Sequence, residues 1–222
     1  ATEAAGVKRK IYGAARFSNP GLRDRLESEG VETISCDALD ADQVAALPRV
    51  PNLMYMLGVK FGTSGNEDLT WAANCAAPAV AMHHFRDARV VAFSTGNVYG
   101  LVPADSGGSR ETDTLRPVGE YAYTAVGREH VFQYYCRARN TPTCLIRLNY
   151  AVEMRYGVLV DLATKVWNEK PINVSMGYAN CIWQADANAM ALRAFEAASC
   201  PATILNSAGP EMLRVRDVCE IF

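Results

Sequence analysis

The chain has 222 residues, of which half are hydrophobic and 21% are charged, and its formal net charge is −2. This composition is typical of a folded globular protein. It excludes a largely disordered chain and a strongly basic protein that binds nucleic acid or a membrane surface. No apolar run approaches the roughly 18–20 residues that span a bilayer, and no secretory signal is visible.

The seven cysteines are widely spaced, odd in number and without a C-x-x-C pair. Such a pattern predicts neither a disulfide framework nor a zinc site. The three histidines do not stand at metal-ligand spacing from the cysteines. We therefore expect reduced, mostly buried thiols, no bound metal and a cytoplasmic protein.

Strand and helix patterns alternate through the first 150 residues. Short runs of apolar and β-branched residues predict strands, and longer patterns between them predict helices. In chain order, the predicted strands cover residues 10–15, 31–35, 52–57, 89–94 and 143–148. The predicted helices cover residues 22–29, 40–47 (with Asp40 as amino-terminal cap), 66–86 and, after a polar loop over 100–117, 119–139. This alternation predicts β-α-β units and a parallel sheet covered on both faces.

The pattern changes after Leu148. Helices are predicted over residues 156–168, from a cap at Asp186 to about residue 198, and from residue 215 onward. Short strands are predicted over residues 172–174, 181–183 and 203–206. No Pro- or Gly-rich linker separates this part, so we expect it to pack on the first part.

Candidate ligand contacts follow the predicted strands, because ligands of an open parallel sheet bind beyond the carboxyl ends of its strands. Five groups of residues hold such positions: Arg16; Asp37; Gly58, Val59, Lys60 and Phe61; Ser94, Thr95 and Gly96; and Asn149 with Tyr150. We expect these five groups to line one crevice.

The first two groups bear on a dinucleotide cofactor. Arg16 stands where a dinucleotide site meets the adenine ribose, and an arginine there can receive a 2′-phosphate, so Arg16 favours NADP over NAD. Asp37 could contact the adenine amino group. The alternatives are a solvated surface arginine and an aspartate that caps a turn or helix.

The glycine-rich phosphate loop of dinucleotide sites, G-x-G-x-x-G, does not occur in the chain. Residues Ala1 to Gly6 resemble the end of a helix that leads directly into the strand from Lys10. We expect that a strand, the loop and half a helix precede this sequence in the full protein. The alternative is that the protein binds no dinucleotide.

Four motifs then occur in order along the chain. They are Ser94-Thr95-Gly96-Asn97-Val98-Tyr99-Gly100, Tyr121-Ala122-Tyr123-Thr124-Ala125-Val126-Gly127-Arg128-Glu129, Leu145-Ile146-Arg147-Leu148-Asn149-Tyr150 and Ile182-Trp183-Gln184-Ala185-Asp186-Ala187-Asn188. On these motifs the chain resembles the extended short-chain dehydrogenase/reductase family, the NAD-dependent epimerase/dehydratases. Asn74, in the long helix before Ser94, stands where that family has a structural asparagine.

The resemblance implies an α/β fold with a Rossmann-like, doubly wound parallel sheet and a smaller carboxyl-terminal substrate region. Residues 1–150 would form the dinucleotide-binding domain, and residues 151–222 part of the substrate region, including segments that return to the sheet. The cofactor would be NAD or NADP, and the substrate a sugar, a nucleotide sugar or a related hydroxy or carbonyl compound. A homodimer is also implied.

The resemblance also assigns roles to residues. Tyr121 would be the acid/base, and Thr95 or its neighbour Ser94 would hydrogen-bond the substrate oxygen. Substrate contacts would come from the loop and strand end after these residues: Asn97, Asn149 and Tyr150. The cofactor would meet Arg16, Asp37, Gly58, Val59, Lys60, Asn74 and Tyr121.

One departure from the family concerns the lysine four residues after the tyrosine, whose charge lowers the tyrosine pKa. Ala125 stands at that place after Tyr121, and Gly127 after Tyr123. We hypothesise that Lys60 or Arg128 supplies the charge. Arg128 and Glu129 are also candidates for an ion pair with a residue across the fold or in a dimer. The alternatives to an enzyme are a non-catalytic NAD(P)-binding sensor or scaffold, and a protein of this fold that binds another small ligand.

Overall fold

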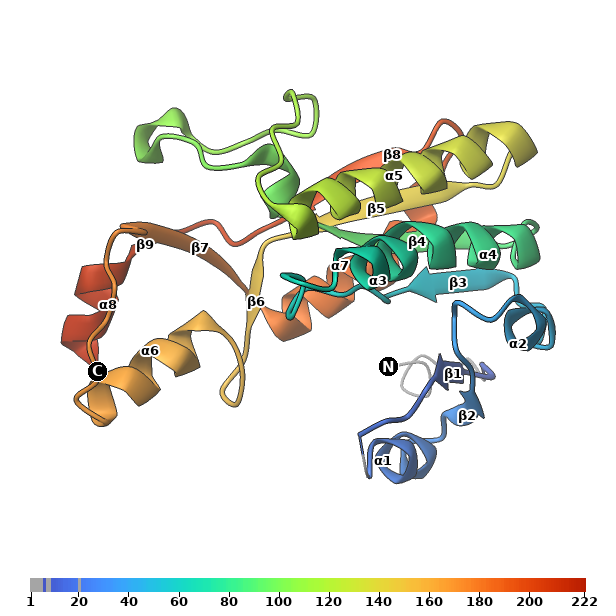
Figure 1. Ribbon diagram of the computed structural model, residues 1–222, viewed down its shortest axis with the longest axis horizontal. Coiled ribbons are helices and arrows are strands. Elements are labelled where there is room, and N and C mark those ends of the chain that lie inside the picture. Colours follow the sequence, from blue (N-terminus) through green and yellow to red (C-terminus); the bar gives the residue numbers. More distant parts are fainter. Residues whose placement is uncertain (1–5, 7–8, 20) are drawn as a thin grey trace.

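The computed structural model describes residue 6, residues 9–19 and residues 21–222 (Figure 1). The helix end expected over residues 1–6 lies, apart from residue 6, outside these residues. Among the described residues, no helix combines the length and the apolarity that crossing a bilayer requires.

A four-stranded parallel sheet forms the centre of the molecule, in the order β3 (Asn52–Tyr55), β4 (Arg89–Thr95), β5 (Thr143–Leu148) and β8 (Thr203–Ser207). The two central strands, β4 and β5, are rich in apolar residues and are buried on both faces, as expected for such a sheet. The predicted Rossmann-like α/β fold is therefore confirmed.

Helices cover both faces of this sheet (Figure 1). On one face, α4 (Ala77–His84) and α5 (Glu120–Arg139) pack Met82 and Phe132 against Val90 and Leu145. On the other face, α7 (Gln184–Ala197) packs against β4 and β5. Neighbouring residues of β4 face opposite helices, because successive side chains of a strand alternate between the two faces.

The long helix predicted over residues 66–86 consists of three consecutive parts. α3 (Glu67–Trp71) continues through a π-helical turn, η1 (Ala72–Ala76), into α4. π-helical turns are rare in proteins overall, but those that occur are often found at functional sites. This one carries the buried Asn74.

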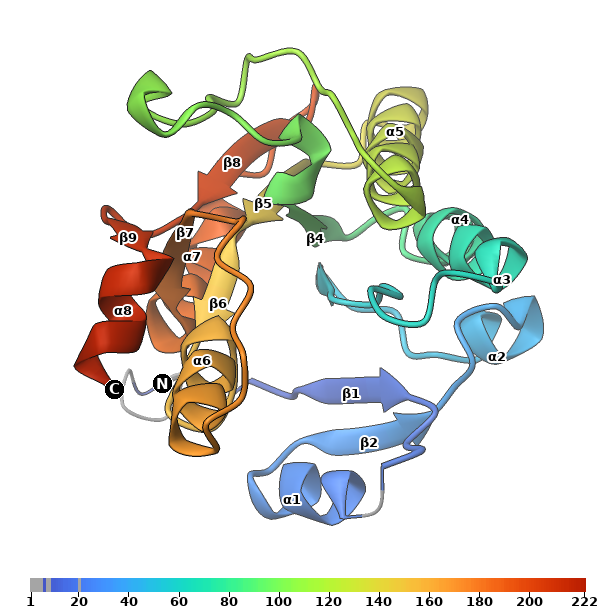
Figure 2. The same cartoon turned by 60° about the vertical axis from the view of Figure 1, so that its left-hand side comes forward.

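Strands β1 (Tyr12–Ala15) and β2 (Glu32–Ser35) form a separate parallel pair beside α1 (Leu22–Ser28) (Figure 2). Among the described residues, neither strand is hydrogen-bonded to β3. The next helix, α2 (Ala41–Ala45), is capped as predicted by Asp40, whose carboxylate accepts from the backbone N–H groups of Asp42 and Gln43 at 3.0 and 3.1 Å.

The last third forms a small third sheet of β6 (Tyr150–Val152), β7 (Tyr178–Trp183) and β9 (Met212–Arg214), with α6 (Val158–Trp167) and α8 (Val215–Ile221). The strand predicted over residues 172–174 is wrong, since those residues lie outside any strand. Asn173 instead accepts from the Ser175 backbone in a tight turn. Asp186 is likewise not the cap of α7, which begins at Gln184, but an acidic residue of its first turn.

His84, at the end of α4, is 6% exposed, and its Nε2 lies 2.9 Å from the Leu47 carbonyl oxygen. Burial is the main cause that lowers the pKa of His84 below its ordinary value, and the nearby Arg49 adds to this effect. The folded protein thus binds the His84 proton less readily than the unfolded chain does.

We expect His84 to make folding stability depend on pH. The unfolded chain gains this proton near pH 6.5. The stability from neutral His84 is therefore complete above about pH 6.5 and is lost as the pH falls toward its lower folded pKa. His84→Gln should flatten the fall of urea-unfolding free energy between about pH 7 and 5.5, whereas a substitution of the exposed His83 by Gln should not. Equal pH slopes in the wild type and His84→Gln would contradict this expectation.

Candidate active site

A cavity of about 280 Å³ opens at the carboxyl ends of β3 and β4. Its lining comes from the loop after β3, from strands β4, β5 and β6 and from helices α5 and α7: Met56, Gly58, Lys60, Phe93, Ser94, Tyr121, Arg128, Leu148, Ala151, Gln184, Ala187 and Asn188. The volume lies at the lower end of small-molecule sites. Four of the predicted site residues, Gly58, Lys60, Ser94 and Tyr121, meet there.

Asn74 holds the loop after β3 in place. Its Oδ1 accepts from the Val59 backbone N–H at 2.8 Å, and its Nδ2 donates to the Val59 carbonyl at 3.0 Å. The same Nδ2 donates to Thr124 Oγ1 at 2.8 Å, and Thr124 in turn donates to the Tyr121 carbonyl at 3.0 Å. Asn74 is completely buried. The asparagine therefore ties the cavity loop to the first turn of α5 through its own amide group.

Arg128 is the deepest charged residue of the cavity. It is 5% exposed, and its Nη1 donates to the Leu57 carbonyl at 2.9 Å. Its Nε is buried and has no hydrogen-bond partner among the described residues. A Cβ placed on Gly58 would overlap Nη1, so the absence of a side chain at Gly58 lets the guanidinium lie directly against this loop.

Tyr121 and Lys60 stand at opposite walls of the cavity. Tyr121 lies in the first turn of α5, and no described residue hydrogen-bonds its hydroxyl group, which leaves that group free for a ligand. Lys60 is exposed at the rim, with its Nζ 5.3 Å from the Phe61 ring centroid and 5.8 Å from that of Tyr150. Tyr150 is thus brought close to Lys60, as the strand-end argument predicts.

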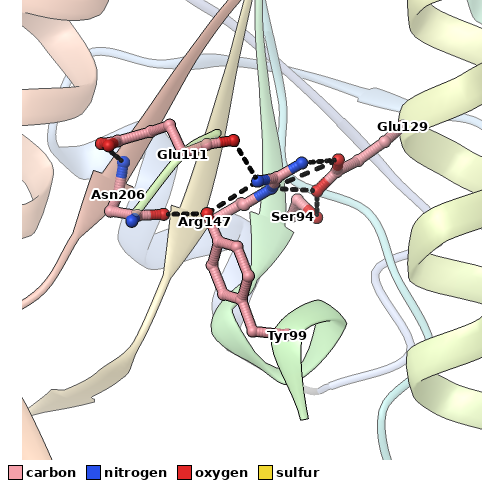
Figure 3. A network of polar contacts seen from close by, with 6 residues as sticks. All are labelled: Ser94, Tyr99, Glu111, Glu129, Arg147 and Asn206. Carbon is pink, nitrogen blue, oxygen red and sulfur yellow. Dashed lines mark hydrogen bonds and ion pairs between the residues drawn. The ribbon is translucent and has the colours of Figure 1, made fainter. Parts of the chain in front are cut away.

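Ser94, at the cavity wall, belongs to a buried polar network (Figure 3). Its hydroxyl donates to Glu129 Oε1 at 2.5 Å. Glu129 is held by Arg147 in a two-pronged ion pair, Nε to Oε1 at 3.0 Å and Nη2 to Oε2 at 2.7 Å. The side chains of this pair are 1% and 3% exposed. The expected ion pair across the fold is thus formed by Glu129, whose partner is Arg147, whereas Arg128 forms no ion pair with a described residue.

The network continues from Arg147 to the long loop over residues 100–117 (Figure 3). Arg147 Nη1 donates to the Tyr99 hydroxyl at 2.7 Å and to the Glu111 carbonyl at 3.2 Å. The Tyr99 hydroxyl donates to Asn206 Oδ1 at 2.8 Å, and the Glu111 carboxylate accepts from the Asn206 backbone at 2.8 Å. The loop is thus fastened to β5 and β8 beside the cavity.

Thr95 and Asn97 lie next to the cavity but do not line it. Thr95 is 8% exposed, and its hydroxyl accepts from the Asn97 backbone at 3.3 Å, which caps the short helix η2 (Gly96–Tyr99). Successive residues of a strand point to opposite faces. Of the two candidate hydroxyls, Ser94 is therefore the one that lies at the cavity.

Asn149 and Asn180 join the central sheet to the small third sheet. Asn149 Nδ2 donates to Asn180 Oδ1 at 2.9 Å, and Asn180 donates to the carbonyls of Gly209 and Glu211 at 2.6 and 2.7 Å. This part of the Asn149 amide is thus occupied by a contact within the chain.

Arg16 and Asp37 lie at the ends of β1 and β2, outside the cavity lining. The Arg16 guanidinium is 4.0 Å from the Asp37 carboxylate, and both side chains are exposed. Asp37 also accepts from the Leu39 backbone in a turn. The expectation that all five strand-end groups line one crevice is thus met only in part, because β1 and β2 belong to a separate strand pair.

The sequence motifs did not identify two polar residues of the cavity, Gln184 and Asn188. They are four residues apart at the start of α7 and so share one helix face. Both residues belong to the motif Ile182 to Asn188, and their four-residue spacing at a helix start could have indicated that they share a surface. A second hollow, of about 300 Å³, lies at the opposite end of the sheet beside Arg49 and His84, away from the carboxyl strand ends.

Comparison with known proteins agrees with the fold and with the motifs. The family model described as "NAD dependent epimerase/dehydratase family" matches residues 2–152. A search of curated protein sequences finds no match. No cluster of three or more His, Cys, Asp or Glu side chains suited to a metal ion occurs in the part of the chain that the structure describes.

Solved structures with the same fold include UDP-glucuronic acid 4-epimerase from Bacillus cereus in complex with NAD. It has a TM-score of 0.79 and 17% identity over 94% of this chain and 73% of that one. DesIV, a dTDP-glucose 4,6-dehydratase from Streptomyces venezuelae solved with NAD, has a TM-score of 0.84 and 19% identity over 99% and 74%. RMD from Pseudomonas aeruginosa, solved with NADPH, has a TM-score of 0.75 and 12% identity over 96% and 83%.

Proposed function

The chain belongs to the NAD-dependent epimerase/dehydratase family, and from this premise we propose that it is an NAD(P)-dependent oxidoreductase of the epimerase/dehydratase type. Its substrate is a sugar, a nucleotide sugar or a related hydroxy or carbonyl compound. The observation that supports this proposal most is the cavity in which Gly58, Lys60, Ser94, Tyr121 and Arg128 meet at the carboxyl ends of the strands.

The cavity fits one end of a dinucleotide. Its floor is the loop at Gly58, and its apolar walls, Met56, Phe93 and Leu148, can enclose a flat ring. When bound, NAD(P) supplies hydride transfer. The chain's own part would be to hold that ring between Gly58 and Tyr121 and to exclude water from it.

Tyr121 is the proposed acid/base. A tyrosine hydroxyl has an ordinary pKa near 10, and a general base works best with a pKa near the working pH. In general, a nearby positive charge favours the deprotonated form of a tyrosine and so lowers its pKa toward the working pH. Arg128 follows Tyr121 by seven residues, which places both on similar faces of α5, and Lys60 stands across the cavity. These two cations are the proposed replacements for the family's lysine, which is Ala125 here.

The cofactor is proposed to be NAD or NADP, with Arg16 favouring NADP. Arg16 is exposed, and at 4.0 Å its contact with Asp37 is loose. Its guanidinium can therefore turn toward a 2′-phosphate. Asp37 remains a proposed contact of the adenine end.

A non-catalytic NAD(P)-binding sensor or scaffold is the alternative. Two observations favour it: Ala125 stands at the lysine position, and the Ser94 hydroxyl already donates its hydrogen to Glu129. Such a protein would bind the cofactor without turning over a substrate.

The remaining features belong to the same proposal. We propose residues 1–150 as the cofactor domain and residues 151–222 as part of the substrate region; the pairing of β8 with β5 agrees with a return to the sheet. A homodimer through α5 is supported by its exposed Tyr123 and Tyr134. A cytoplasmic location is supported by the seven free cysteines.

A titration of the full-length protein with NADH and with NADPH, followed by nicotinamide fluorescence, tests the proposal. We expect one of the two to bind. NADPH should bind more tightly than NADH. Arg16→Ala should lower the affinity for NADPH relative to NADH by about tenfold, the effect of one charge-assisted contact. A screen of UDP-glucose, UDP-glucuronate and dTDP-glucose for cofactor-dependent turnover then separates the enzyme from the sensor. If neither NADH nor NADPH binds, both the enzyme and the NAD(P)-binding sensor are refuted.

A further inference from the structure

Arg128 carries a buried charge without a counter-charge. Its residue is 5% exposed, its Nη1 is satisfied by a neutral carbonyl, and its Nε has no partner. No carboxylate among the described residues lies within 4.0 Å of it. Arginine stays protonated in proteins, and an uncompensated buried charge is strongly destabilising. The fold thus keeps a cation where an anionic partner would be favourable.

Lys60 adds a second positive charge to the same cavity. Its ammonium group lies near two aromatic rings, those of Phe61 and Tyr150, and forms no ion pair with a described residue. The twelve lining residues include no aspartate or glutamate. Two cations without an anion attract a negatively charged group, and the attraction is strong where the surroundings exclude water.

We propose that this cavity binds a substrate that carries a carboxylate close to its reacting carbon, such as a uronic acid or its nucleotide derivative. This inference rests on the proposed function. Arg128 and Lys60 both line the cavity, and a guanidinium can hold a planar carboxylate through two parallel hydrogen bonds. Tyr121 lines the same cavity, so the carboxylate and the reacting carbon belong to one end of the substrate.

In this proposal the charge on Arg128 binds the carboxylate of the substrate. A phosphate of the cofactor is the other anion that the site could receive. The two anions can be told apart, because removal of the Arg128 charge would weaken binding of the substrate in one case and of the cofactor in the other.

The test measures the dissociation constants of UDP-glucuronate and UDP-glucose for the full-length protein by calorimetry, with NADH present. The two probes differ only at carbon 6 of the sugar, which is a carboxylate in UDP-glucuronate and a hydroxymethyl group in UDP-glucose. We expect UDP-glucuronate to bind at least about tenfold more tightly, a preference that Arg128→Gln abolishes and Arg128→Lys partly restores. Lys60→Gln should reduce the preference by a smaller factor. Lys165→Gln, an exposed lysine of α6 outside the cavity, is the control.

The outcomes separate the explanations. A wild type that binds NADH but binds the two sugars equally overturns the carboxylate inference while the proposed function stands. A tenfold loss of NADH affinity in Arg128→Gln, without a sugar preference in the wild type, assigns the anion to a cofactor phosphate and also overturns it. Should Arg128→Gln fail to fold, the exposed Lys60→Gln still decides, because an unchanged preference in that variant contradicts the two-cation site.

Discussion

Replacement of Tyr121 by phenylalanine is expected to lower cofactor-dependent turnover by about 10²–10⁴-fold, the range in which a positioned acid/base contributes. The hydroxyl group is the only group removed. It lies at the cavity, and no described residue hydrogen-bonds it, so the fold should not change. The NADH dissociation constant should change less than about threefold, because the ring of residue 121 remains.

Tyr123 provides a matched control. It is the alternative register of the tyrosine motif, it is 50% exposed, and it does not line the cavity. Tyr123→Phe should leave turnover unchanged. The assignment of the acid/base to Tyr121 fails if Tyr121→Phe retains full turnover, or if Tyr123→Phe is the variant that loses it.

Replacement of Arg147 by methionine is expected to cost about 3–5 kcal/mol of unfolding free energy, because it leaves a buried carboxylate without its partner. Glu129 is 1% exposed and would keep only the Ser94 hydroxyl as a donor. The Tyr99 hydroxyl and the Glu111 carbonyl would lose a donor as well. The loop over residues 100–117 should then become more accessible to proteases, which limited proteolysis can detect.

Two variants sharpen this measurement, which is made by urea unfolding. Arg147→Met combined with Glu129→Leu removes both charges and should recover most of the lost stability. Arg155→Met removes a strongly exposed arginine from its ion pair with Glu153 and should cost less than about 1 kcal/mol. A single Arg147→Met variant as stable as Arg155→Met would contradict the structural role of the network.

The fold could be predicted from the sequence because its main signals are local. The strands at residues 52–57 and 89–94 are short apolar runs, and the Asp40 cap follows from side-chain chemistry at a helix start. The meeting of Gly58, Lys60 and Ser94 also followed, since the carboxyl ends of parallel strands share one edge.

Other features depend on contacts between distant segments and could not be predicted. β6 and β9 have three residues each, too few to show a period, and they form because β7 lies between them. The partner of Glu129 is Arg147, eighteen residues away on β5, and the sequence predicted an ion pair across the fold or in a dimer without identifying this arginine. The separation of β1 and β2 from the central sheet also places Arg16 and Asp37 outside the cavity, although they too follow strands.

The central claim is that the cavity between Gly58 and Tyr121 receives the nicotinamide end of NAD(P). A crystal structure of the chain grown with NADPH, or with NADH if that binds more tightly, tests it most directly. The account predicts electron density for the nicotinamide ring beside Gly58. The Tyr121 hydroxyl should face the same space, so that a substrate bound against the ring lies within its hydrogen-bonding distance. Density for the cofactor elsewhere on the chain, with this cavity filled only by solvent, would contradict it.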